Sequence, residues 1–121
     1  MARILLADDT LFMRATLKKV LSDAGFDIVG EAENGKLAVE RYEELKPDLV
    51  MLDITMPVKT GLEALEEIMK LDPNATVIMC TAIGQERVVA QALQTGAKDY
   101  IIKPFKPDKV VDAVNKAISR S

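Results

Sequence analysis

The stretch Leu49-Val50-Met51-Leu52-Asp53 places four apolar side chains in succession in front of an aspartate. Three further short apolar runs lie at residues 4–7, 77–80 and 100–102. Continuous runs of this length are typical of parallel strands that are buried on both faces. The segment 26–32 is more polar and is expected to be a strand at the side of the sheet. The sequence therefore predicts five strands.

Amphipathic stretches with helical spacing follow each of the five predicted strands. Each carries a recognisable start or stop signal, among them Gly25, Asn34, Thr60, Gly96 and Pro107. Thr60 begins the capping box Thr60-Gly61-Leu62-Glu63. The order is a strand and a helix repeated five times, which predicts a parallel α/β sheet with helices on both faces. We expect a flavodoxin-like (βα)5 doubly wound sandwich with strand order 2-1-3-4-5.

Size and composition predict one globular unit. The chain has 121 residues, 49% of them hydrophobic and 29% charged, and we expect residues 1–121 to be one domain with no output domain attached. The net charge of −3 disfavours nucleic-acid binding, which needs clustered basic residues. No apolar stretch approaches the length of a membrane span, and no signal peptide is evident, so we expect no membrane partner and a cytoplasmic location.

The absent and rare residue types limit the chemistry that is possible. Histidine does not occur, which excludes a histidine base, metal ligand or phosphohistidine in this chain. The one cysteine, Cys80, lies inside an apolar run and is expected to be a small core residue. Any reaction must therefore use carboxylates, hydroxyls, lysine and a metal ion.

Polar side chains directly follow four of the predicted strands. They are Asp8 and Asp9, Asp53, Thr81 and Lys103. The carboxyl ends of parallel strands are where open α/β sheets bind ligands, so these side chains are expected to meet. Each alone is an ordinary turn, cap or surface residue. Together, three carboxylates require a cation, and oxygen ligands with a nearby lysine and hydroxyl suit Mg²⁺ and a phosphoryl group.

These residues, in their order and spacing, resemble the receiver family of two-component signalling. The similarity extends from about residue 3 to residue 118 and is carried by residues 8–9, 52–57 with Gly61, 81–82 and 103–105. Within that family the chain is most similar to the stand-alone chemotaxis regulators (CheY-like). Residues 10–14 and 98–100 support this narrower resemblance.

The resemblance implies a role for each residue of the predicted site. Asp53 would accept a phosphoryl group from a phosphohistidine of a sensor histidine kinase. Asp9 and Asp53 would ligate Mg²⁺ with the backbone carbonyl of Thr55, and Asp8 would act through water. Lys103 would pair first with Asp53 and then with the phosphate. The protein would be a switch with slow self-catalysed dephosphorylation, and no enzyme in the ordinary sense.

The resemblance also implies how phosphorylation would be transmitted. Thr81 would move to hydrogen-bond the phosphate, Tyr100 would turn inward behind it, and the Lys103–Pro104 peptide bond would be cis. The surface read by a partner would comprise residues 85–95, 100–102 and the last helix. A monomer that binds a flagellar motor switch protein is the expected form.

Three other functions remain open on the sequence. A phosphorelay intermediate would use the same pocket but pass its phosphoryl group to another histidine. An aspartate-nucleophile phosphatase of the haloacid dehalogenase type would have Asp53-Ile54-Thr55 as its nucleophile motif, although that motif normally follows the first strand. A flavin-binding electron carrier would need a phosphate loop where Asp8 and Asp9 stand.

Overall fold

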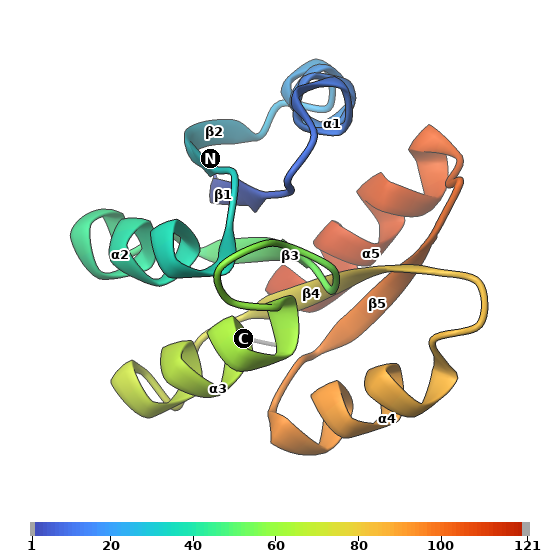
Figure 1. Cartoon of the computed structure of the whole chain (residues 1–121). Coiled ribbons are helices and arrows are strands. Elements are labelled where there is room, and N and C mark those ends of the chain that lie inside the picture. The colour runs from blue at the N-terminus through green and yellow to red at the C-terminus, as the bar shows by residue number, and fades with distance from the viewer. Residues whose placement is uncertain (1, 120–121) are drawn as a thin grey trace.

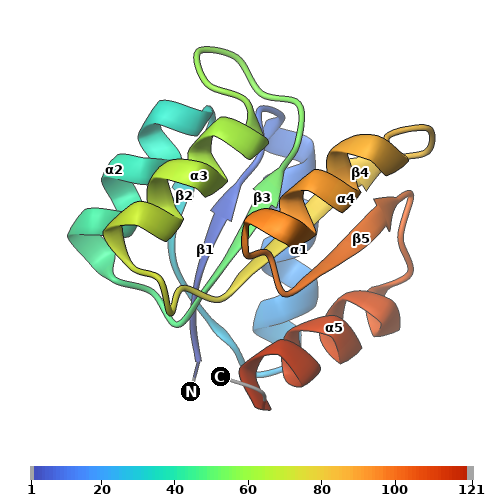
Figure 2. The same cartoon turned by 90° about the horizontal axis from the view of Figure 1, so that it is seen from below.

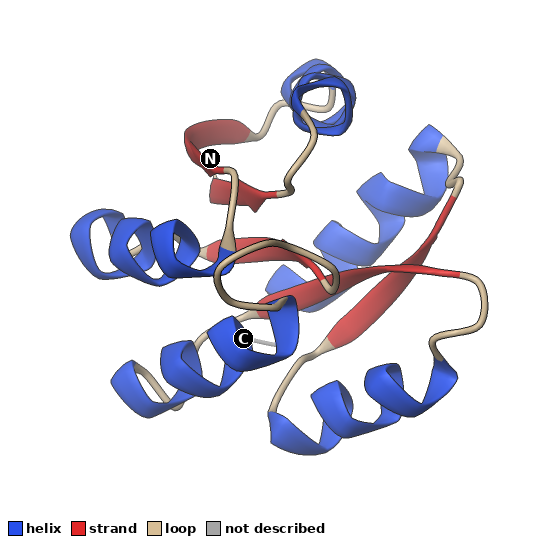
Figure 3. Cartoon of the chain, in the orientation of Figure 1, coloured by secondary structure: helices blue, strands red, loops and turns tan. Residues whose placement is uncertain are grey.

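Strands and helices alternate along the whole described chain. The computed structural model describes residues 2–119, and Figures 1 and 3 show the course of the chain through its elements. The elements are β1 (Arg3–Ala7), α1 (Leu11–Asp23), β2 (Asp27–Ala32), α2 (Gly35–Leu45), β3 (Leu49–Asp53), α3 (Gly61–Leu71), β4 (Val77–Ala82), α4 (Glu86–Thr95), β5 (Asp99–Lys103) and α5 (Pro107–Ser119). Within residues 2–119, none of the helices has the length and apolarity needed to cross a membrane.

The five strands form one parallel sheet in the order β2-β1-β3-β4-β5, which confirms the predicted fold class. Every residue of the central strand β3 is buried, as its continuous apolar run requires. The more polar β2 lies at one side of the sheet and is only partly covered, as its composition predicts.

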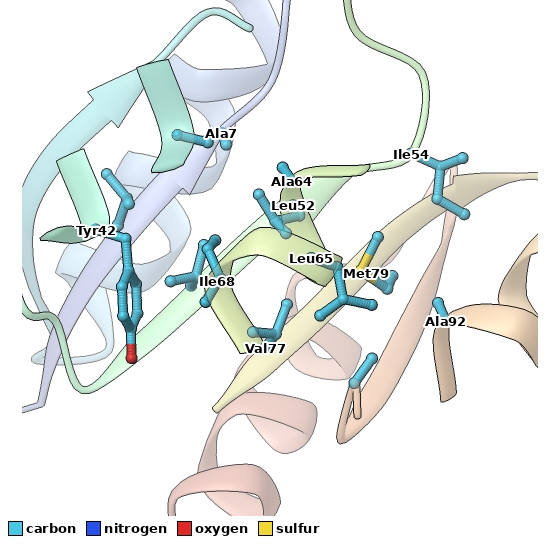
Figure 4. Close-up of a cluster of buried hydrophobic side chains, with 14 of the residues drawn as sticks. Ala7, Tyr42, Leu52, Ile54, Ala64, Leu65, Ile68, Val77, Met79 and Ala92 are labelled. Carbon is cyan, nitrogen blue, oxygen red and sulfur yellow. The ribbon is translucent and has the colours of Figure 1, made fainter. Parts of the chain in front are cut away.

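Two hydrophobic layers hold the helices on the two faces of this sheet. Helices α2, α3 and α4 cover one face and α1 and α5 cover the other, as Figure 1 shows. Figure 2 views the sheet from the side of α3 and α4, with α1 behind it. The first layer includes Leu52, Leu65 and Ile68, which Figure 4 shows together. Cys80 lies in the second layer, 1% exposed, which confirms its prediction as a core residue. Burial raises the pKa of its thiol to about 12.

The helix ends carry the predicted caps. The Thr60 side chain accepts from the backbone N–H of Glu63, and the Glu63 carboxylate accepts from the backbone N–H of Thr60. The Asn34 side chain accepts from Leu37 at 2.8 Å. These local bonds satisfy backbone donors that a helix start would otherwise leave open. They also fix where the loops that follow β2 and β3 end.

Candidate functional site

Three carboxylates gather at the carboxyl end of the sheet. Asp8 follows β1 and Asp53 ends β3, and these strands are neighbours with Ala7 paired to Leu52. Asp8, Asp9 and Asp53 each place a carboxylate oxygen within 4.8 Å of the others. Asp8 and Asp53 are buried, whereas Asp9 is exposed. The sequence prediction that these three residues meet agrees with this placement.

Lys103 brings a positive charge to the same cluster. It ends β5, which is separated from β3 by β4, so its long side chain spans the end of β4. Its Nζ lies 2.8 Å from Asp8 Oδ2 and 3.3 Å from Asp53 Oδ1. The other oxygen of Asp8 accepts from the backbone N–H and the hydroxyl of Thr10, at 2.9 and 3.0 Å. Asp8 is therefore held at both oxygens, whereas the Lys103 contact of Asp53 is to one oxygen, Oδ1.

The electrostatics of the cluster show a shortage of positive charge. Burial raises the pKa of Asp53 to about 6; the Lys103 ammonium acts in the opposite direction, while Asp8 and then Asp9 raise it further. Burial lowers the pKa of Lys103, but its contacts with Asp8 and Asp53 outweigh burial, so its pKa lies above the usual value. One ammonium thus balances three carboxylates only in part. A hard divalent cation suits an oxygen cluster with this charge.

Thr81 stands beside this cluster at the end of β4 and is 2% exposed. Its backbone is paired with Ile102 of β5, and the preceding residue, Cys80, is paired with Asp53. Its hydroxyl lies 3.0 Å from Gln85 Oε1 and 3.1 Å from the carbonyl oxygen of Ala82. The hydroxyl is therefore engaged on the α4 side.

Tyr100 lies on the outer side of this region, on β5. Its side chain is exposed, and it lines a pocket of about 240 Å³ together with Thr81, Val89, Leu93 and other residues of the β4–α4 turn and α4. The structure thus places Tyr100 beside a pocket that Thr81 also lines.

The Lys103–Pro104 peptide bond, at the end of β5, is cis.

The β3–α3 loop, which carries Thr55, is tightly held against Asp53. The Gly61 N–H donates to the Ile54 carbonyl at 2.8 Å, and the Gly35 N–H donates to the Lys59 carbonyl at 3.1 Å. A Cβ atom at Gly61 would lie 2.0 Å from the Asp53 carbonyl oxygen. Glycine at this position is what allows the loop to pass so close to the strand end.

Two side chains that bear on the site were not predicted from the sequence. Arg14 donates to the Asp8 carbonyl at 2.7 Å and to Glu31 at 3.0 Å, which ties the β1–α1 turn to β2. Gln85 bonds to Thr81, to the backbone of Ala82 and to Thr55. The sequence does not predict these contacts of Arg14 and Gln85, because a polar residue near the start of a helix is common and its partners depend on which segments approach it in the folded chain.

Comparisons with known proteins agree with this geometry. The sequence model of the response regulator receiver domain matches residues 4–115. Chemotaxis protein CheY of Thermotoga maritima is 54% identical over 94% of this chain and 95% of its own length. Chemotaxis protein CheY of Listeria monocytogenes is 53% identical over 97% of this chain and 98% of its own.

Solved structures of a response regulator domain and of a CheY complex are also similar to this chain. The response regulator domain of Thermotoga maritima CheB superposes with a TM-score of 0.91 at 36% identity, covering 98% of this chain and 97% of that one. The CheX–CheY–BeF3–Mg²⁺ complex from Borrelia burgdorferi contains a chain with a TM-score of 0.92 at 38% identity, covering 95% of this chain and 87% of that one.

Proposed function

Because this chain belongs to the response regulator receiver domain family, we propose that it is a signalling switch activated by phosphorylation of Asp53. The observation that supports this most directly is the placement of Asp53 beside two other carboxylates and the Lys103 ammonium at one end of the sheet. Relatives named chemotaxis protein CheY support a role in chemotaxis. The phosphoryl donor we propose is a phosphohistidine of a sensor kinase.

In the proposed phosphoryl transfer, Asp53 is the nucleophile, and the other residues of the site hold Mg²⁺ or balance charge. An Asp53 carboxylate oxygen forms a bond to phosphorus while the bond from phosphorus to the donor nitrogen breaks, and the electron pair leaves with that nitrogen. Mg²⁺, when bound, supplies positive charge to the oxygens of the transferring group. We propose that Asp9, Asp53 and the Thr55 carbonyl hold it, with Asp8 acting through water. Lys103 leaves Asp53 and pairs with the new phosphoryl oxygens.

Acetyl phosphate tests the proposal without requiring the kinase. Incubation of the full chain with acetyl phosphate and Mg²⁺ should add one phosphoryl group, measured as the intact mass, and a chelator should prevent it. A chain that gains no mass under these conditions would contradict phosphorylation at this site.

The metal assignment predicts the effect of Asp9→Asn. Loss of one carboxylate charge from an oxygen-ligand site should weaken Mg²⁺ binding by at least about 10-fold, measured by isothermal titration calorimetry. Asp112→Asn removes the same charge from an exposed position on α5 and is the matched control. Equal affinities for Asp9→Asn and wild type would show that the ion is held elsewhere.

The output surface is proposed to lie on α4, β5 and α5. It exposes Ile83, Leu93, Tyr100 and Ile102 around the pocket that begins at Thr81, and Tyr100 would turn into this pocket on activation. We propose a flagellar motor switch protein as the partner.

Ile102→Ser should therefore weaken capture of that partner by the beryllofluoride-loaded chain by at least about tenfold, because it removes an exposed apolar side chain from the proposed interface. Phosphorylation itself should be unchanged. Leu71→Ser, at an exposed apolar position at the end of α3, is the control in a pull-down assay. Capture of a histidine phosphotransfer protein in place of the motor protein would favour the phosphorelay alternative.

A further inference from the structure

Gln85 connects the two loops that flank Asp53. It lies just before α4, and its Oε1 accepts from the Thr81 hydroxyl at 3.0 Å and from the Ala82 N–H at 3.0 Å. Its Nε2 donates to the Thr55 hydroxyl at 3.3 Å, across from β4 to the β3–α3 loop. One side chain thus contacts both the buried hydroxyl of the site and the loop beside Asp53.

The direction of the Gln85 amide is fixed by its partners. The Ala82 N–H can only donate, so the atom that faces it must be the amide oxygen. The same oxygen then accepts the Thr81 hydroxyl proton, and the amide nitrogen is left to face Thr55. Gln85 therefore acts as an acceptor for Thr81 and cannot reverse this role without losing the bond to Ala82.

The Thr81 hydroxyl carries one proton and can donate only one full hydrogen bond. In the unphosphorylated chain this proton is directed between Gln85 Oε1 at 3.0 Å and the Ala82 carbonyl oxygen at 3.1 Å. A donation to a phosphoryl oxygen on Asp53 therefore requires that both contacts be given up. We propose that Gln85 is a positioning residue that holds Thr81 in the unphosphorylated arrangement and so sets the threshold of the switch. This inference rests on the function proposed above, since the competing acceptor is the phosphoryl group.

A purely structural role explains the contacts of Gln85 less well. Gln85 occupies the N-cap position of α4, but its side chain makes no capping bond to the helix. The residue is half-buried, and Ala82 is exposed, so water can replace the amide oxygen at the Ala82 N–H. Removal of the amide should thus leave α4 intact and change mainly the partner available to Thr81.

Gln85→Met removes the amide while it keeps the length of the side chain. We expect this variant to bind beryllofluoride, in the presence of Mg²⁺, roughly 2- to 10-fold more tightly than wild type. The reason is that the unliganded state loses the Gln85 acceptor and keeps only the Ala82 carbonyl for the Thr81 hydroxyl, whereas the liganded state uses neither. Isothermal titration calorimetry measures the affinity. Gln91→Met, the same change at an exposed position of α4, should bind as wild type does.

A double-mutant cycle separates action through Thr81 from a general effect of the substitution. In a Thr81→Val background, Gln85→Met should leave the beryllofluoride affinity unchanged. In the unliganded protein, the three-bond couplings of the Thr81 methyl group should show more rotamer averaging in Gln85→Met than in Gln91→Met. Should Gln85→Met fail to fold, Gln85→Ala tests the same loss of the amide.

Two results would overturn the inference. An affinity of Gln85→Met equal to or weaker than that of wild type would show that the amide does not restrain Thr81. An equal gain in the Thr81→Val background would show that Gln85 acts by another route. A wild-type chain that binds no beryllofluoride would instead overturn the proposed function, so the two failures are distinguishable.

Discussion

Asp53→Asn is expected to gain no phosphoryl group from acetyl phosphate and Mg²⁺. The amide is nearly the same shape as the carboxylate, but it lacks the negative oxygen that attacks phosphorus. The two other carboxylates should not take over. Asp8 is bound through both oxygens to Lys103 and Thr10, and Asp9 lies in an exposed position without the Lys103 contact of Asp53. Intact-mass spectrometry measures the loss.

Two comparisons show that this loss is not a loss of the fold. Asp27→Asn, at an exposed position that begins β2, should be labelled as fully as wild type. In the absence of Mg²⁺, Asp53→Asn should melt at or above the wild-type temperature, because it removes one of three clustered negative charges from a buried position. Full labelling of Asp53→Asn would refute the assignment of the phosphorylated residue.

The fold could be predicted from the sequence because its signals are local. The run at residues 49–52 is apolar at every position, and the strand it forms is buried on both faces at the centre of the sheet. The capping box at Thr60 places the start of α3. Strand order followed from the alternation of strands and helices together with the polar character of β2. Each of these features depends on neighbouring residues and a general rule of packing.

The site could be predicted only in part. Asp8, Asp53, Thr81 and Lys103 were found because each directly follows an apolar run, and parallel strands end on the same side of the sheet. Gln85 belongs to no strand end, and its contacts to Thr81 and Thr55 exist only because two loops approach each other in the folded chain. Sequence rules assign residues to elements, but they do not give the distance between two loops.

Val58 shows the same limit for the backbone. Its φ of 67° lies in the left-handed region, and the N–H of Lys59 donates to the carbonyl of Pro57 at 2.8 Å across it. A β-branched residue such as valine is unfavourable in this conformation. The sequence around Val58 therefore does not predict a positive φ at this position. The loop accepts this strain because both of its ends are held, at Ile54 by Gly61 and at Lys59 by Gly35.

Gly61→Ala should have the second large effect, because it forces apart the loop and the strand that carries Asp53. The new Cβ would lie 2.0 Å from the Asp53 carbonyl oxygen and 2.8 Å from Ile54 Cα. Both are backbone atoms that cannot move aside as the end of a side chain can. We expect a loss of about 3 kcal/mol in the free energy of unfolding, measured by urea denaturation, at the upper end of typical overpacking costs.

The sign of the change in unfolding free energy shows whether the steric clash or helix propensity dominates in Gly61→Ala. Gly61 is the first residue of α3, and alanine in a helix is favoured over glycine by about 1 kcal/mol, so propensity alone predicts stabilisation. Gly84→Ala is the control for backbone conformation: its φ is 96° and a Cβ there meets no atom within 4 Å, so it should cost only about 1–2 kcal/mol. Because the clash acts on the Asp53 carbonyl, Gly61→Ala should also slow labelling by acetyl phosphate, whereas Gly84→Ala should slow it less. If the two variants lost equal stability, the clash with the Asp53 carbonyl oxygen would not be the main cost of Gly61→Ala.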